Sequence, residues 1–423
     1  MKLFRNCEKW PANMMKSSLW WTLWTSRKRV SFAERAPRPG MAKQSPTIAL
    51  VAGEASGDQL GAALIERLRE RYPEARFAGI GGKHMKAAGL EAWWDSEELA
   101  LFGLVEVLSH IPRLLKLRKE LAHRLQALSP DVFIGIDAPD FNLGLELRLR
   151  RSGIRTIHYV SPTVWAWRKR RVRKISRAAD LVLCLFPFEP EFYRDHGVKA
   201  AYVGHPMADQ ISPDNDPVPA RERLKLDPEN RTVALLPGSR GSEASRLSEP
   251  MIQAATQLAA RDPALQFVAA MANDKVQALF RSAMQQSGFE HIRLVSNDPR
   301  TVIAAADVVM CASGTVALET LLVNRPMVVT YRISPATYYL AKYLKLIRPQ
   351  LFSLPNILAG EKLVPELIQH ESTGENLARE VRKWLDSQAS RESLKDRFLQ
   401  IHERLCCDAS KRAADAVSGL LES

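Results

Sequence analysis

The chain has 423 residues, 46% hydrophobic and 25% charged, which is typical of a globular protein large enough for two buried cores. Its formal net charge of +13 favours anionic partners such as phosphorylated substrates or anionic lipid, the alternative being a solvated basic surface. Five cysteines without a C-x-x-C motif argue against a disulfide framework or a zinc site, and no stretch has the roughly 20 consecutive apolar residues of a membrane span.

Residues 1–46 form a basic, Trp-rich extension that we expect to be non-structural. Met1–Gly40 carries nine Lys or Arg and two Glu, and its apolar residues are too interrupted for a signal peptide. Another methionine, Met41, lies just ahead of the first predicted strand. We therefore expect Met1–Gly40 to be dispensable for folding and activity.

Apolar runs alternate with helical patterns between residues 47 and 211, which predicts a doubly wound parallel sheet. A helix is predicted over Gln59–Arg71, where Leu60, Leu64 and Leu68 have helical spacing. The continuous apolar run DVFIGI is typical of a parallel strand buried on both faces. The predicted strands are Thr47–Ala52, Ala75–Ile80, Asp131–Ile136, Ile154–Val160 and Leu181–Leu185.

The segment 212–219 (SPDNDPVP) has the composition of a linker, and the strand–helix pattern restarts after it. A second Rossmann-like domain is predicted over residues 220–389, followed by C-terminal helices (390–423) that pack back on the first domain or on a partner subunit. We thus expect an α/β fold with two Rossmann-like domains facing each other across a cleft. The strands predicted here are Thr232–Leu236, Gln266–Ala270, Ile292–Val295, Asp307–Cys311 and Met327–Tyr331.

Two distant segments share one pattern, a short apolar run followed by a Gly/Ser loop and a helix: TIALVAGEASGD and TVALLPGSRGSE. This pattern presents backbone N–H groups and a helix N-terminus to a ligand. Loop one (Gly53–Asp58) lacks the G-x-G-x-x-G spacing and carries Glu54, Ser56 and Asp58, which suit sugar hydroxyls rather than a diphosphate. The alternative is that Ser56 and Asp58 only cap the helix.

Loop two (Pro237–Glu243) replaces the acids of loop one with a cation. Gly238 permits close backbone approach, Ser239 offers a hydroxyl, and Arg240 offers a planar fork for phosphate oxygens. These three residues and Glu243 are candidate binding residues. The alternative is an ordinary turn with an exposed Arg.

The segment CASGTVALE (Cys311–Glu319) again joins an apolar strand to a helix. Ser313, Gly314 and Thr315 would give the helix a second anion-binding end, and Glu319 could accept ribose hydroxyls. Together with Arg240 this predicts a nucleotide diphosphate held without metal. The alternative is a capped core helix.

Asp137 and Asp140 follow a predicted buried strand in GIDAPDFN, at the carboxyl edge where α/β sheets bind ligands. Asp137 is the candidate general base. No D-x-D motif lies between apolar flanks, so a metal-bridging pair is not favoured. The alternatives are a turn residue at Asp137 and a helix cap at Asp140.

Downstream, His158 and Trp165 lie in HYVSPTVWAWR, where aromatic rings and Arg168 could contact a ring or a phosphate, or simply pack. Gly204-His205-Pro206 ends the first half and could line the cleft or act as a hinge.

The segment Leu101–Arg124 joins an apolar stretch to a basic amphipathic helix, a combination that suits an anionic bilayer surface. The alternative is a core helix with a solvated basic face. The candidate membrane contacts are Leu101, Phe102, Leu104, Val105, Leu108, Arg113 and Lys116.

From about Thr47 to the C-terminus, seven motifs in unchanged order closely resemble those of the lipid-A-disaccharide synthase family. They are GEASGD (Gly53–Asp58), GIDAPDFN (Gly135–Asn142), HYVSPTVWAWR (His158–Arg168), GHPMAD (Gly204–Asp209), LPGSRGSE (Leu236–Glu243), ASGTVALE (Ala312–Glu319) and SLPNILAG (Ser353–Gly360).

The resemblance implies an inverting GT-B glycosyltransferase of family 19 that joins UDP-2,3-diacylglucosamine to 2,3-diacylglucosamine 1-phosphate (lipid X). The products would be UDP and the β-1,6-linked disaccharide 1-phosphate of lipid A (lipopolysaccharide) biosynthesis in Gram-negative bacteria. The family works peripherally at the cytoplasmic face of the inner membrane, and a domain-swapped homodimer is known in it. We expect no cofactor, no metal and no nucleic-acid partner.

The resemblance also places Asn356 at the nucleotide site and Glu54 and Ser56 near the acceptor. Asp137 would take the proton of the acceptor 6-hydroxyl, and Arg240 would stabilise charge on the leaving diphosphate. The alternatives are a UDP-sugar 2-epimerase on the same fold and a lipid-binding protein that keeps an inactive transferase fold.

Overall fold

The computed structural model describes residues 45–99, 104–162, 169–334 and 351–423. The predictions for Met1–Gly40, Leu101, Phe102 and Trp165 lie outside these residues, and so do the side chains of Leu104, Val105 and Leu108.

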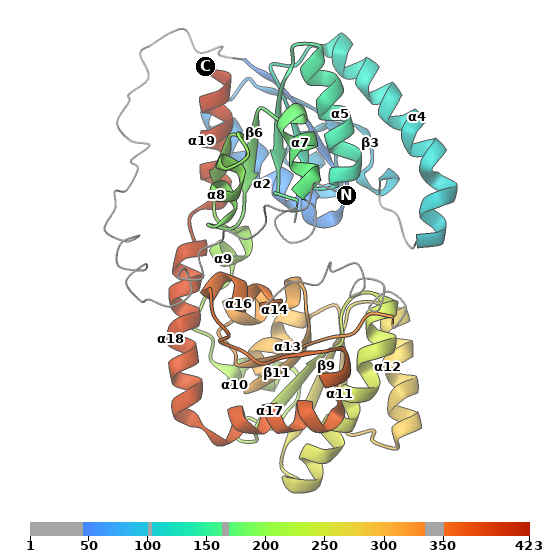
Figure 1. Cartoon of the computed structure of the whole chain (residues 1–423), viewed down its shortest axis with the longest axis vertical. Coiled ribbons are helices and arrows are strands. Elements are labelled where there is room, and N and C mark those ends of the chain that lie inside the picture. The colour runs from blue at the N-terminus through green and yellow to red at the C-terminus, as the bar shows by residue number, and fades with distance from the viewer. Residues whose placement is uncertain (1–44, 100–103, 163–168, 335–350) are drawn as a thin grey trace, which may run out of the picture. The chain divides into compact units, whose positions relative to one another are not determined.

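The first sheet has seven strands, and every strand pairs in parallel with its neighbours (Figure 1). Their spatial order is β3 (Glu91–Trp94), β2 (Arg76–Ile80), β1 (Thr47–Ala52), β4 (Val132–Ile136), β5 (Arg155–Tyr159), β6 (Leu181–Cys184) and β7 (Ala200–Tyr202). The helices of this half are α2 (Ala55–Arg71), α3 (Lys83–Ala87), α4 (Leu104–Leu128), α5 (Pro139–Arg151), α7 (Lys169–Ala178), α8 (Glu189–Arg194) and α9 (Pro206–Gln210).

The second sheet has six parallel strands in the order β10 (Arg293–Ser296), β9 (Gln266–Met271), β8 (Thr232–Leu236), β11 (Val308–Ala312), β12 (Met327–Tyr331) and β13 (Glu366–Ile368). Its helices are α10 (Pro217–Arg223), α11 (Gly241–Arg261), α12 (Asp274–Ser287), α13 (Pro299–Ala305), α14 (Thr315–Leu322), α16 (Leu354–Ala359) and α17 (Gly374–Asp386). The chain ends in α18 (Gln388–Leu405) and α19 (Ala409–Leu421).

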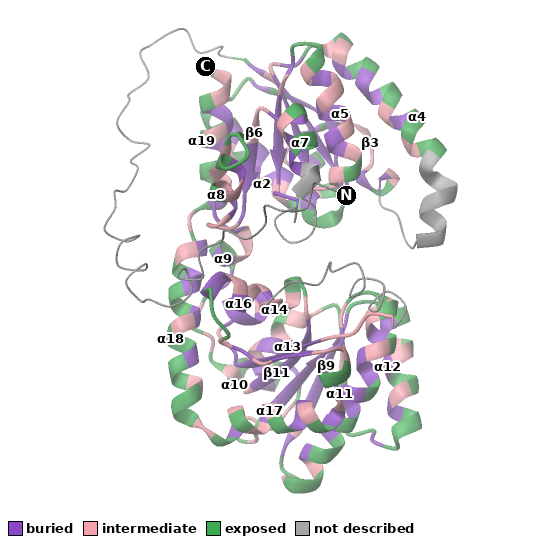
Figure 2. Cartoon of the chain, viewed as in Figure 1, coloured by how far each residue is buried: buried purple, intermediate pink, exposed green. Residues whose placement is uncertain are grey.

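The central strands are apolar at nearly every position, and successive side chains point to opposite faces of the sheet. Both faces of each sheet are therefore apolar, and helices cover both. In β8, Val233 and Leu235 join a core with α11, α12 and α17, while Ala234 and Leu236 join a core with α13, α14 and α18. Figure 2 shows the same pattern, with buried strands inside and exposed residues on the outer faces of the helices.

The structure confirms all ten predicted strands, with ends that differ by at most one residue. Three strands were not predicted from the sequence: β3, β7 and β13, which are three or four residues long and lie at sheet edges. An edge strand is paired on one side only, so its sequence need not be continuously apolar. The helix predicted over Gln59–Arg71 begins four residues earlier, at Ala55.

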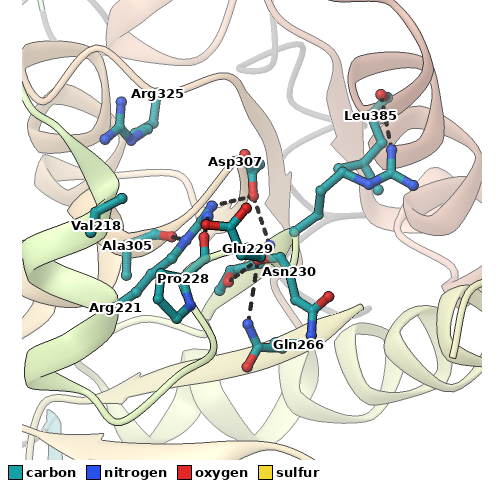
Figure 3. Close-up of polar contacts among 12 residues, drawn as sticks. Val218, Arg221, Pro228, Glu229, Asn230, Gln266, Ala305, Asp307, Arg325 and Leu385 are labelled. Carbon is teal, nitrogen blue, oxygen red and sulfur yellow. Dashed lines mark hydrogen bonds and ion pairs between the residues drawn. The ribbon is translucent and has the colours of Figure 1, made fainter. Parts of the chain in front are cut away.

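The linker prediction needs one correction, because α10 begins inside residues 212–219. The Asp216 side chain caps this helix by accepting a hydrogen bond from the Val218 N–H at 3.0 Å. Buried Arg221 then donates to the carbonyls of Pro228 and Ala305 and to the Asp307 carboxylate, at 2.7, 3.0 and 2.6 Å (Figure 3). These bonds attach α10 to the start of the second sheet.

The segment after the first sheet is bonded to the junction between α18 and α19. The Asp209 carboxylate accepts hydrogen bonds from the N–H groups of Cys407, Asp408 and Ala409 at 2.7–2.9 Å. The His205 N–H donates to the Leu405 carbonyl at 2.9 Å. Beyond this junction α19 packs against α2, so the end of the chain returns to the first sheet.

Candidate functional site

Each sheet reverses its strand order once, between β1 and β4 in the first and between β8 and β11 in the second. Loop one follows β1, and the Asp137 turn follows β4. Loop two follows β8, and the Ser313–Thr315 segment follows β11. Since ligands of α/β sheets bind outside the carboxyl ends of the strands at such switch points, the four predicted loops occupy the expected binding positions.

The Asp137 turn has an unusual backbone. Asp137 and Ala138 both have positive φ angles, 51° and 42°, which non-glycine residues rarely adopt. The Asp137 N–H donates to the Tyr159 carbonyl at 2.8 Å, and the Asp137 carbonyl accepts from Asn142 Nδ2 at 2.8 Å. Such backbone strain persists where surrounding contacts fix it and is common at active sites.

Loop one packs directly on this turn. A Cβ atom at Gly53 would lie 2.7 Å from the Ala138 Cβ, so only glycine fits there. Glu54 is the N-cap residue of α2 but forms no side-chain capping bond. Burial and the neighbouring Asp137 carboxylate raise the pKa of Glu54, while Arg240 opposes the shift. Ser56 is exposed in the first turn of α2.

Asp58, in contrast, has a structural role. Its side chain is buried, with 3% of the residue exposed, and accepts from the N–H groups of Gly82, His84 and Met85 at 2.7–3.1 Å. The His84 ring lies 2.9 Å from the same carboxylate. Burial acts to raise the pKa of Asp58, but these hydrogen bonds outweigh it and lower the pKa. The carboxylate therefore connects loop one to α3, and its oxygens are not available to accept hydrogen bonds from sugar hydroxyls.

Two further predicted ligand residues are fully buried. Asn356 accepts from the N–H groups of Leu363 and Val364 and donates to the Val364 carbonyl, so its amide supports a loop rather than a nucleotide. His158 is buried in the first sheet, where its Nδ1 lies 2.7 Å from Glu146 Oε1. Glu146 was not predicted from the sequence, although a Glu on the apolar face of a helix is a recognisable signal of a buried polar contact.

Loop two projects its cation outward. The Arg240 side chain is 80% exposed and lies 3.6 Å from Glu243 Oε1. Gly238 has a φ of 102°, and a Cβ there would lie 2.6 Å from Glu243 Oε2, so Glu243 packs beneath the loop. Ser239 is exposed, and its carbonyl accepts from Asn273 Nδ2 at 3.1 Å. Arg240 and Ser239 can reach an anion, whereas Glu243 supports the loop.

At the start of α14, Gly314 and Thr315 are exposed, while the Ser313 N–H donates to the Thr330 carbonyl at 3.1 Å. Glu319 lies one turn further and pairs with Arg300 at 3.3 Å. Burial raises the pKa of Glu319, and Arg300 opposes this. A carboxyl that is partly buried beside one cation retains acceptor capacity for a hydroxyl.

The predicted membrane segment lies on α4. Arg113 pairs with Glu98, Lys116 lies 3.9 Å from Glu120, and Leu115 between them is 50% exposed. Asp140, at the start of α5, is exposed, and its carbonyl accepts from Arg118 of α4 at 3.4 Å. Within the described residues, every helix is too short or too polar to cross a bilayer.

Comparison with known proteins identifies the family. The model of the lipid-A-disaccharide synthetase family matches residues 48–417. A lipid-A-disaccharide synthase of Xanthomonas axonopodis pv. citri (strain 306) is 50% identical over 387 residues, which cover 91% of this chain and 88% of the relative.

Solved structures show the same fold at low identity. The glycotransferase of kitacinnamycin has a TM-score of 0.58 at 16% identity, covering 91% of this chain and all of that one. A UDP-GlcNAc 2-epimerase from Neisseria meningitidis has a TM-score of 0.55 at 13% identity, covering 89% and 99%. These likenesses show the two-domain GT-B architecture alone and do not favour the epimerase alternative. The match along most of the sequence decides the family: this chain belongs to the lipid-A-disaccharide synthases and is a glycosyltransferase.

Proposed function

We propose that the protein transfers 2,3-diacylglucosamine from UDP to the 6-hydroxyl of lipid X. In this reaction the bond from the acceptor O6 to the donor C1 forms on the face opposite UDP, and the C1–O bond to UDP breaks. UDP leaves with the bonding electrons, and the hydroxyl proton passes to a base. The observation that carries the proposal is the 50% identity to a lipid-A-disaccharide synthase over 91% of the chain.

The donor would bind at the switch point of the second sheet. Arg240 is exposed and free to turn toward a diphosphate, because its contact with Glu243 is long. Ser239, Gly314 and Thr315 are exposed beside it or across the same switch point. A guanidinium and a helix N-terminus stabilise the charge that develops on a leaving diphosphate.

The acceptor would bind at the switch point of the first sheet, with Asp137 as the base. Asp137 is half-buried on a strained turn, and it lies close enough to Glu54 to raise the pKa of that residue. Two neighbouring carboxyls suit a sugar with several hydroxyls, one accepting the reacting proton and the other orienting the ring.

The test is the Asp137→Asn variant, assayed for UDP release from the two lipid substrates, with UDP binding measured separately. We expect turnover to fall about 10²–10⁴-fold, the usual contribution of a general base, while UDP affinity stays unchanged. Asp195→Asn, an exposed residue of the same half, serves as the control. Near-normal turnover of Asp137→Asn would remove Asp137 from this role.

We further propose that α4 holds the enzyme at an anionic bilayer surface, where its acylated substrates reside. Exposed Arg113, Leu115 and Lys116 lie on this helix, and cations near such a surface contribute about 1 kcal/mol each. The domain-swapped homodimer stays a prediction.

Vesicle flotation tests the membrane proposal with pure phosphatidylcholine and with added phosphatidylglycerol. We expect Leu104→Ser with Leu108→Ser to lower binding to both, and Arg113→Gln with Lys116→Gln to lower only the gain from phosphatidylglycerol. Leu399→Ser, which changes an exposed leucine of α18, is the control. Unchanged flotation of both double variants would contradict the proposal.

A further inference from the structure

A cluster of fully buried polar side chains lies beneath the Asp137 turn, between α5 and the strands β4 and β5. Its members are Asn142 and Glu146 of α5 and His158 of β5. Asn142 and Glu146 are four residues apart and therefore point to the same side of the helix. None of the three is exposed to solvent, so a role in contacting substrate directly is excluded for each.

Asn142 holds the ends of two strands and the turn itself. Its Nδ2 faces the carbonyls of Asp137, Ile136 and Val51 at 2.8, 3.3 and 3.4 Å. These three carbonyls belong to the carboxyl ends of β1 and β4 and to the turn that follows β4. The amide therefore ties loop one's strand to the strand that carries the proposed base.

Glu146 and His158 connect α5 to the neighbouring strand. Glu146 Oε1 lies 2.7 Å from His158 Nδ1, and neither side chain has any exposed surface. His158 pairs in register with Gly135 of β4, two residues before Asp137. A strong hydrogen bond in this position fixes the height and rotation of α5 relative to the sheet.

Gly135 provides the space for this contact. A Cβ at residue 135 would lie 2.3 Å from Glu146 Oε1 and 2.9 Å from the Asn142 Cβ. Among the described residues, Asn142 Oδ1, Glu146 Oε2 and His158 Nε2 are buried without a hydrogen-bond partner. Such atoms destabilise the fold, so the cluster is poorly explained as a device for stability.

We infer that Asn142, Glu146 and His158 are positioning residues that hold the Asp137 turn in its strained, reactive geometry. This inference rests on the proposed role of Asp137 as the base. The physical link is α5, which begins at Pro139 directly after Asp137 and the N-cap residue Ala138 and which carries Glu146 in its second turn. A shift of the helix therefore moves the turn, and a misplacement of about 1 Å can lower a rate about 10²-fold.

Two amide substitutions of His158 separate the loss of the hydrogen bond to Glu146 from the loss of the imidazole ring itself. In His158→Asn the amide nitrogen takes the place of Nδ1 and can still donate to Glu146, whereas in His158→Gln the longer side chain cannot place it there. We expect kcat to stay within about threefold of wild type for His158→Asn and to fall about 10- to 100-fold for His158→Gln. UDP affinity should be unchanged in both.

Gly135→Ala disturbs the same contact without removing a polar group, and it should also lower kcat. Gly419→Ala, where no atom among the described residues lies within 4 Å of the added Cβ, is the matched control. Thermal unfolding of every variant identifies those that fail to fold. Equal kcat for His158→Asn and His158→Gln, with wild-type kcat for Gly135→Ala, would overturn the inference.

Combination with Asp137→Asn distinguishes this inference from the proposed function. If the cluster acts through Asp137, His158→Gln should lower the residual rate of Asp137→Asn by less than threefold. Full additivity of the two losses would refute the positioning role and leave the base intact. Normal turnover of Asp137→Asn alone would refute the base instead.

Discussion

Gly53→Ala is expected to inactivate the enzyme without unfolding it. The added Cβ would lie 2.7 Å from the Ala138 Cβ, whereas ordinary contacts between such atoms begin at about 3.4 Å. Both atoms are bonded directly to the backbone, so no side-chain rotation relieves the clash. Loop one or the Asp137 turn must therefore move by at least about 0.7 Å.

The displacement sets the size of both effects. Overpacking of this kind costs about 1–3 kcal/mol of unfolding free energy, which a protein of this size survives. A movement approaching 1 Å at the reacting group lowers turnover about 10²-fold. Since the clash is confined to the first sheet, we expect UDP affinity to stay at the wild-type value.

Gly57→Ala is the matched control, four residues further along the same loop and helix. Its Cβ would lie 3.4 Å from the Ala52 Cβ and 3.6 Å from the Ile136 side chain, which is ordinary packing. Alanine is also the better helix former by about 1 kcal/mol, so this variant should be active and at least as stable as wild type.

The rescue is Gly53→Ala combined with Ala138→Gly. It removes the clashing atom and places glycine at a φ of 42°, which glycine adopts readily. The assay is initial-rate UDP release with both lipid substrates, alongside urea unfolding. Full activity of Gly53→Ala alone, or equal inactivity of the single and double variants, would refute the steric reasoning.

Two further predictions concern stability. Burial lowers the pKa of His205 from 6.5 to about 4, while Asp209 opposes the shift, so the folded protein disfavours the charged ring. The folded state is therefore fully stable above pH 6.5, where the ring is neutral, and it loses stability relative to the unfolded state as the pH falls toward 4. Unfolding free energy should therefore fall by on the order of 3 kcal/mol across that window, and His205→Gln should flatten the slope in urea titrations; an unchanged slope would contradict the assignment. Arg221→Leu should lower the unfolding free energy by about 3 kcal/mol, because it leaves Asp307 and two carbonyls without their buried donor. Asp307→Asn should lower the unfolding free energy by less, because Asp307 is more exposed than Arg221 and the amide oxygen of the new Asn can still accept from the Thr232 N–H. Equal losses for the two variants would contradict this ranking.

The two parallel sheets and the loops that carry the proposed chemistry could be predicted from the residues alone. Continuous apolar runs such as Val132–Ile136 and Thr232–Leu236 are local signals, because a strand buried on both faces needs apolar residues at every position. The small-residue loops after β1 and β8 are equally local, since they mark a strand-to-helix turn within about ten residues.

Which polar side chains of those loops remain available to a ligand depends on the packing of distant elements. Glu54 and Asp58 are both acidic residues of one motif, yet the Asp58 carboxylate already accepts hydrogen bonds from N–H groups some 25 residues away, in and before α3. His158 is likewise hydrogen-bonded to Glu146 of a different element, and Asn356 is hydrogen-bonded to the loop that follows its helix. A hydrogen-bond partner that is distant in sequence cannot be recognised from the residues around the motif. The same residue type in the same motif can therefore bind a ligand or support a loop, and only the packing of the elements distinguishes the two.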